Sequence, residues 1–177
     1  AWATDSLPLG GYGNPINPVG LIVSSFRPSD DATIFPFLVP SNYFAVVSLK
    51  HLSEIIAGVS RDNIFANECN ALADEVEDAL NKYAVAEHLN FGKIFPYEID
   101  GFGNKLFMDD ANIPSLLSLP YLNAIRAEDD LYKNTRKFLF SINNPYYFVG
   151  KAGNGIGGPH AGLDKIWHLS VIMRGIT

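Results

Sequence analysis

The segment SSFRPSDDA, residues 24–32, places two adjacent carboxylates, Asp30 and Asp31, just after an arginine and a serine. A carboxylic acid can donate a proton in catalysis when burial beside a second carboxylate raises its pKa. A structural alternative is that Ser29 caps a short helix whose positive end favours the two acids. Arg27 could pair with either of them. Because adjacent acidic residues are common on surfaces, spacing alone favours the helix start over the catalytic site.

A second acidic pair, Asp109 and Asp110, lies in the aromatic-rich segment YEIDGFGNKLFMDDANIPSLL, residues 97–117. Carboxylates accept hydrogen bonds from hydroxyl groups, and aromatic faces cover the C–H face of a sugar ring, so this composition fits carbohydrate recognition. The alternative is that Asp110 or Asn112 caps a helix opened by Pro114. The residues alone leave these two interpretations balanced.

The segment GKAGNGIGGPH, residues 150–160, is a glycine-rich loop that ends in His160. It lacks the GK[ST] ending of a phosphate-binding loop and the glycine spacing of a dinucleotide site, which excludes both. Its glycines can instead let the backbone approach a ligand closely, and this makes His160 a candidate ligand contact. Trp167, a few residues later, is more simply interpreted as core or as the wall of a cavity.

Several classes of protein are disfavoured by the composition. The chain has no G-x-S-x-G motif and no helical pair of histidine ligands, which argues against a serine hydrolase and a metal-dependent hydrolase. The net charge of −6 and the pI near 5.1 argue against a nucleic-acid partner. The single cysteine, Cys69, cannot form an internal disulfide. No apolar run is long enough for a transmembrane helix, no cofactor or metal is expected, and the compartment stays open.

The chemistry-bearing segments must be positioned by helices. The period of the apolar residues predicts helices at 41–57, 68–89, 113–125, 128–141 and 163–176. Ser41 is expected to cap the first, whose wide apolar stripe implies heavy burial. A short connection at 60–65 makes the first two an antiparallel hairpin. Turn signals predict a β-hairpin within 93–110, and residues 146–162 are predicted as strand followed by loop.

Four stretches together resemble glycoside hydrolase family 125, a family of exo-α-1,6-mannosidases. They are SSFRPSDDATIFPFLVPSNYFAVVSL, YEIDGFGNKLFMDDANIPSLLSLPYL, GKAGNGIGGPH and IWHLSVIMRGIT, and the resemblance runs from about residue 23 to the C-terminus. It implies a mainly α fold, part of an (α/α)6 barrel with small β-hairpins in the active-site loops. It also implies metal-independent, inverting hydrolysis that releases terminal α-1,6-linked mannose.

The resemblance assigns roles to eight residues. The general acid would be Asp30 or Asp31, and Asp31 is preferred. The supporting and substrate-binding residues would be Arg27, Ser29, Asp109, Asp110, Asn112 and His160. An inverting enzyme also needs a second carboxylate, about 6.5–9.5 Å away, to activate water. In the family this is a glutamate in a segment that follows the IMRGIT-like helix, where the present chain ends.

Residues 1–177 are therefore expected to form a single, incomplete catalytic domain, truncated at both ends. Its partner would be a mannose-containing oligosaccharide, and the uncovered helix faces of an incomplete barrel would favour self-association. Without the base, the isolated chain is expected to have little or no hydrolytic activity. Two alternatives stay open: a non-catalytic carbohydrate-binding or scaffolding fragment, and a glycosidase of the same fold with another sugar specificity.

Overall fold

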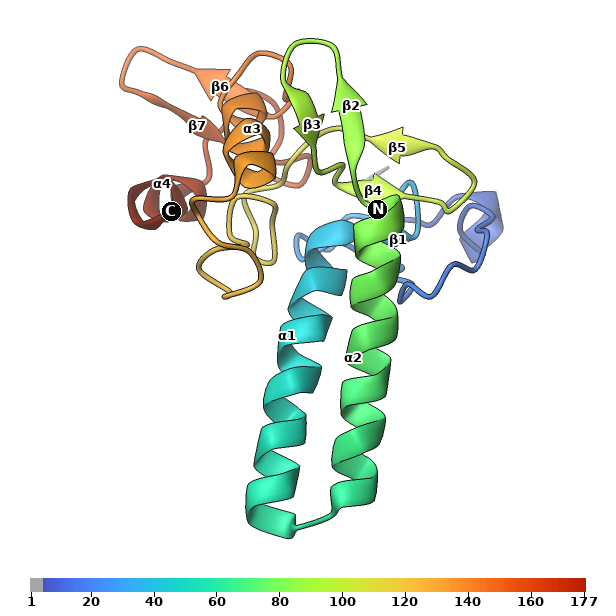
Figure 1. Cartoon of the computed structure of the whole chain (residues 1–177). Coiled ribbons are helices and arrows are strands. Elements are labelled where there is room, and N and C mark those ends of the chain that lie inside the picture. The colour runs from blue at the N-terminus through green and yellow to red at the C-terminus, as the bar shows by residue number, and fades with distance from the viewer. Residues whose placement is uncertain (1–4) are drawn as a thin grey trace.

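The computed structural model describes residues 5–177 and is helical with several very short sheets (Figure 1). Its longest elements are helices α1 (Val39–Ile55) and α2 (Asn63–Tyr83), which pack side by side as the predicted antiparallel hairpin. A π-helical turn, Ile56–Ser60, extends α1, and the chain reverses within two residues before α2 begins. Figure 1 shows this hairpin projecting from the part of the molecule where the strands, α3 and α4 gather.

The ends of the two long helices differ from the predictions. Helix α1 begins at Val39 without a side-chain cap, so the expected cap at Ser41 is wrong; Pro40 instead occupies the first turn, where its missing N–H costs nothing. Helix α2 is capped by Asp62, whose carboxylate accepts a hydrogen bond from the Phe65 N–H at 3.0 Å. It ends at Tyr83 rather than 89, because the chain then turns into a β-hairpin.

The remaining elements are short. Strands that follow one another in the chain form antiparallel pairs: β2 (Ala86–His88) with β3 (Gly92–Ile94), β4 (Glu98–Ile99) with β5 (Lys105–Leu106), and β6 (Tyr147–Val149) with β7 (Asn154–Ile156). Strand β1 (Phe37–Leu38) adds to the edge of β4, in the order β1-β4-β5. Helices α3 (Asp130–Leu139) and α4 (His168–Ile176) follow the predicted positions, although α4 begins later than 163; a 3-10 turn spans Leu9–Gly11.

The helix predicted at 113–125 is wrong, because these residues form a series of turns. The backbone N–H groups of Leu116 and Leu117 donate to the carboxylate of Asp109, at 2.8 and 3.1 Å, instead of to helical carbonyls. Pro120 has no N–H to donate to a helical ladder. A local side-chain acceptor therefore overrides the apolar period of this segment.

The buried apolar side chains form a cluster to which α1, α2, the short strands and α3 all contribute. Large buried side chains of the core include Phe37, Leu38, Leu80, Ile94, Phe95, Tyr97, Leu116, Leu117, Tyr132, Phe138 and Leu139. The heavy burial expected for α1 is wrong in this chain, since Phe44, Leu52 and Ile55 are all exposed. Among residues 5–177, no helix combines the length and the apolar character that crossing a membrane requires.

Candidate functional site

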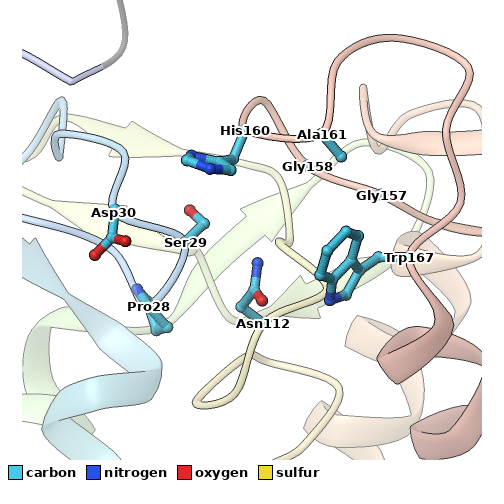
Figure 2. A pocket seen from close by; sticks show the side chains of 9 residues that line it. All are labelled: Pro28, Ser29, Asp30, Asn112, Gly157, Gly158, His160, Ala161 and Trp167. Atoms are coloured by element: carbon cyan, nitrogen blue, oxygen red, sulfur yellow. The ribbon is translucent and has the colours of Figure 1, made fainter. Parts of the chain in front are cut away.

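A cavity of about 220 Å³ lies between the SSFRPSDDA segment and the glycine-rich loop (Figure 2). Its lining residues are Pro28, Ser29, Asp30, Asn112, Gly157, Gly158, His160, Ala161 and Trp167. The three segments selected for their chemistry, 24–32, 97–117 and 150–160, thus meet at one place. Figure 2 shows Ser29 and Asp30 on one side of the cavity, Trp167 on the other, and Asn112 and His160 between them.

The SSFRPSDDA segment is a tight turn, so the helix start expected at Ser29 is wrong. The Arg27 N–H donates to the Asp31 carbonyl at 2.8 Å, the Asp30 N–H donates to the Arg27 carbonyl at 3.0 Å, and Phe26 bridges to Ala32. Asp30 has a φ of 66°, a left-handed conformation that aspartate tolerates better than most residues. The two neighbouring aspartates have different environments: Asp30 is exposed, whereas Asp31 is fully buried.

Asp31 has one carboxylate oxygen occupied and one oxygen without a hydrogen bond. Oδ2 accepts a hydrogen bond from Ser29 Oγ at 2.7 Å. Oδ1 has no hydrogen-bond partner among the described residues and lies 3.9 Å from Nδ1 of His160, which lines the cavity. A fixed carboxyl with one free oxygen beside a cavity suits a proton donor. Asp30 lies in the cavity wall itself, and Figure 2 shows its carboxylate at the side of the cavity opposite Trp167.

Arg27 pairs with Glu98 and not with either aspartate of the turn. Its Nε donates to Glu98 Oε1 at 2.6 Å, and the two side chains are 4% and 0% exposed. Burial by itself lowers the pKa of Arg27, but the hydrogen bond and the charge of Glu98 outweigh burial and raise it. The other oxygen of Glu98 accepts hydrogen bonds from the Ile34 and Phe35 N–H groups at 2.9 and 3.0 Å. Glu98 therefore connects β4 to both arms of the turn.

Asp109 and Asp110 are fully buried and do not line the cavity themselves. Burial raises the pKa of Asp109 to about 8, against the lowering effect of its hydrogen bonds from backbone N–H groups. Asp110 Oδ1 accepts hydrogen bonds from both the N–H and Nδ2 of Asn112 at 2.9 Å. Among residues 5–177, nothing donates a hydrogen bond to the side-chain oxygen of Asn112, which can therefore accept one from a ligand. A Cβ at Gly158 would lie 3.1 Å from each Asp110 oxygen, so only glycine fits without displacement there.

From the sequence, Trp167 could belong either to the core or to the wall of a cavity. In the structure it lines the cavity. It directly precedes α4, is 38% exposed, and its N–H donates to the Ile156 carbonyl at 3.1 Å. This bond joins the start of α4 to β7. The predicted helix at 163–176 includes Trp167, whereas the structure places this residue just before α4, in the lining of the cavity.

Comparisons with known proteins agree with the resemblance found in the sequence. The family model for metal-independent α-mannosidases (GH125) matches residues 1–177. The meiotically up-regulated gene 157 protein of Schizosaccharomyces pombe is 44% identical over 176 residues, which are 98% of this chain and 34% of that protein. A solved Streptococcus pneumoniae structure, from work on metal-independent α-mannosidases, is a non-productive complex with α-1,6-mannobiose. It matches with a TM-score of 0.95 and 36% identity, over 98% of this chain and 41% of that chain.

Proposed function

Since this chain belongs to the metal-independent α-mannosidase family GH125, we propose that it is the central segment of a domain that releases terminal α-1,6-linked mannose from an oligosaccharide. The chain spans about a third of the curated relative and two fifths of the solved one. The observation that carries the proposal is the fixed, buried carboxyl of Asp31, whose free oxygen lies behind a cavity lined by His160, Asn112 and Trp167. The parent fold would be an (α/α)6 barrel, to which α1 and α2 contribute one hairpin.

The cavity offers the contacts that a neutral sugar needs. The exposed face of Trp167 would pack against the C–H face of the ring, because such faces are apolar. Asn112 and His160 would bind hydroxyl groups. Asp110 would act through Asn112, whose amide it orients, and Gly158 would leave room for that carboxylate.

In the proposed reaction, the acid protonates the glycosidic oxygen while water attacks the anomeric carbon from the opposite face. The bond from that carbon to the leaving oxygen breaks, the proton of the acid stays on the leaving alcohol, and a base takes a proton from the water. We assign the acid to Asp31, because Ser29 donates a hydrogen bond to one of its carboxylate oxygens, while the other oxygen has no hydrogen bond among the described residues. The base lies about 6.5–9.5 Å away in an inverting enzyme and would come from outside this chain.

Asparagine substitutions in a longer, active chain that contains this segment test the assignment. Asp31→Asn is expected to lower release of mannose from α-1,6-mannobiose by about a hundredfold or more, because a positioned proton donor contributes that much. Asp30→Asn serves as the matched control and is expected to have the smaller effect. The reverse order would assign the acid to Asp30, and near-normal rates for both variants would overturn the catalytic reading of this turn.

Three further measurements distinguish the proposed activity from the alternatives. NMR of the first product formed should show β-mannose if the configuration inverts, and a panel of α-linked disaccharides tests the preference for the 1,6 linkage. The isolated 177-residue chain is expected to bind mannobiose without hydrolysing it. Turnover by this chain at the rate of the longer one would contradict the proposed location of the base.

A further inference from the structure

Three side chains with metal-binding donor atoms converge beside the cavity: Asp5, Asp31 and His160. One donor atom of each lies within 4.8 Å of the corresponding atoms of the other two. The three residues come from the N-terminal loop, the SSFRPSDDA turn and the glycine-rich loop. The tertiary fold, and not a local sequence motif, therefore brings these donors together.

The carboxylate of Asp31 gives a second indication, separate from the clustering of donors, that a ligand binds here. The Asp31 side chain is fully buried, yet Oδ1 has no hydrogen-bond partner among residues 5–177. Buried polar atoms of this kind are rare in proteins. The distance from Oδ1 to His160 Nδ1 is 3.9 Å, too long for a hydrogen bond. Bonds of about 2.0–2.2 Å to zinc place tetrahedral donors about 3.4 Å apart, so a shift of about half an ångström would let both atoms bind one ion.

The donor atoms of this cluster suit a cation, because two carboxylates and one imidazole supply lone pairs that a metal ion accepts. The positive charge of Arg27, at the other end of the turn, is paired with Glu98. Mg²⁺ and Ca²⁺ prefer all-oxygen sites, whereas a mixed set of imidazole and carboxylate donors suits Zn²⁺. His160 is half-exposed and lines the cavity, so an ion can reach the cluster from solvent.

We propose that Asp5, Asp31 and His160 form a site for a divalent transition-metal ion, with Zn²⁺ as the expected occupant. This site goes beyond the proposed hydrolysis, which needs no metal. A metal ion bound at the site would inhibit that hydrolysis. A bound ion would occupy the Asp31 oxygen that the acid uses, so that metal and proton compete for the same lone pair. Binding itself does not depend on hydrolysis, and the two proposals can therefore fail separately.

Isothermal titration calorimetry of the complete 177-residue chain with ZnCl2, in a buffer free of chelators, tests the site. The wild-type chain is expected to bind Zn²⁺, and the loss of a ligand in Asp5→Asn, Asp31→Asn or His160→Gln is expected to weaken binding at least tenfold. Asp30→Asn is the matched carboxylate control, and His51→Gln removes an exposed histidine of α1. Both controls should bind Zn²⁺ like the wild type, and MgCl2 should give no binding.

Absence of Zn²⁺ binding, or binding that His160→Gln leaves unchanged, would overturn the proposal. Because His160 is half-exposed, this variant is expected to fold even if Asp31→Asn does not, and circular dichroism checks both. In a longer, active chain, Zn²⁺ should inhibit mannose release and EDTA should restore it. Zn²⁺ binding at the cluster without inhibition would support the metal site and overturn the assignment of the acid to Asp31.

Discussion

The backbone conformation of Asp30 sets where the side chains of Asp30 and Asp31 lie. The positive φ of Asp30 belongs to a turn in which this side chain is exposed while that of Asp31 is buried beside Ser29 and His160. Neighbouring carboxylates in different environments can take different chemical roles. The proposed acid and the proposed metal site both depend on this separation.

The buried pair of Arg27 and Glu98 should contribute strongly to stability. Glu98→Gln removes one charge of a fully buried pair and leaves the guanidinium unpaired, which is expected to cost about 3–5 kcal/mol of unfolding free energy. Urea denaturation of the chain measures this. The control is Glu77→Gln, because Glu77 pairs with Lys50 at the same 2.6 Å while the side chains are 45% and 41% exposed. That exposed pair should be worth at most about 1 kcal/mol, and equal losses would contradict the role of burial.

Asp109 should make stability depend on pH between its unfolded and its folded pKa. In the folded chain the pKa is raised from 3.8 to about 8, so the stabilising contribution is fully present below the unfolded value and is lost as pH rises through the folded value. The unfolding free energy of the wild type is therefore expected to fall more steeply between these pH values than that of Asp109→Asn. Parallel pH profiles from denaturant titrations would show that Asp109 is not protonated in the folded chain.

At the scale of helices and strands, the sequence predicts an element correctly where the apolar period of the segment matches the contacts that it makes in the fold. The apolar period of each helix reflects the contacts that it makes along one face. The predicted range 128–141 contains the whole of α3, whereas the predicted range 68–89 finds α2 but places both of its ends too late, since the helix spans Asn63–Tyr83. Prediction from the sequence failed at 113–125, because the acceptor for Leu116 and Leu117 is the carboxylate of Asp109, which propensity does not consider. It also could not find Glu98 as the partner of Arg27, since that contact spans 71 residues.

Trp167, just before α4, should contribute to the affinity of the cavity for a sugar. Trp167→Ala is expected to weaken binding of α-1,6-mannobiose about fivefold or more, since stacking on an aromatic face contributes on the order of 1 kcal/mol. Trp167→Phe should recover part of the affinity. Saturation-transfer NMR on the 177-residue chain provides the measurement. Tyr121→Ala, which removes an exposed aromatic side chain that does not line the cavity, is the control; an equal loss there would contradict the role of the cavity wall.

At the scale of the whole molecule, the hairpin of α1 and α2 leaves apolar side chains in solvent. Val59 and Ile64, at its tip, are 80% and 76% exposed. Apolar patches of this kind favour association between molecules. The proposed barrel would cover such faces in a longer chain, whereas the isolated chain has only the hairpin itself.

Self-association of the isolated chain should therefore depend on the hairpin tip. The double variant Val59→Lys and Ile64→Lys is expected to shift the chain toward monomer in sedimentation velocity experiments. The double variant Ser60→Lys and Asn67→Lys adds the same charge at exposed polar positions of the same hairpin and should shift it less. Equal shifts would mean that charge repulsion, and not apolar contact, controls association.

The projecting hairpin also has a consequence for the order of folding. Its two helices are joined by a two-residue reversal, so its contacts close short loops and can form early. The cavity needs segments from both ends of the chain, and the contact of Arg27 with Glu98 alone closes a loop of 71 residues, at a higher entropic cost. During refolding, much of the helical signal in circular dichroism should return before the chain can bind a sugar. A preparation with the expected helix content can thus still lack its binding site, and ligand binding is the better criterion of a native fold.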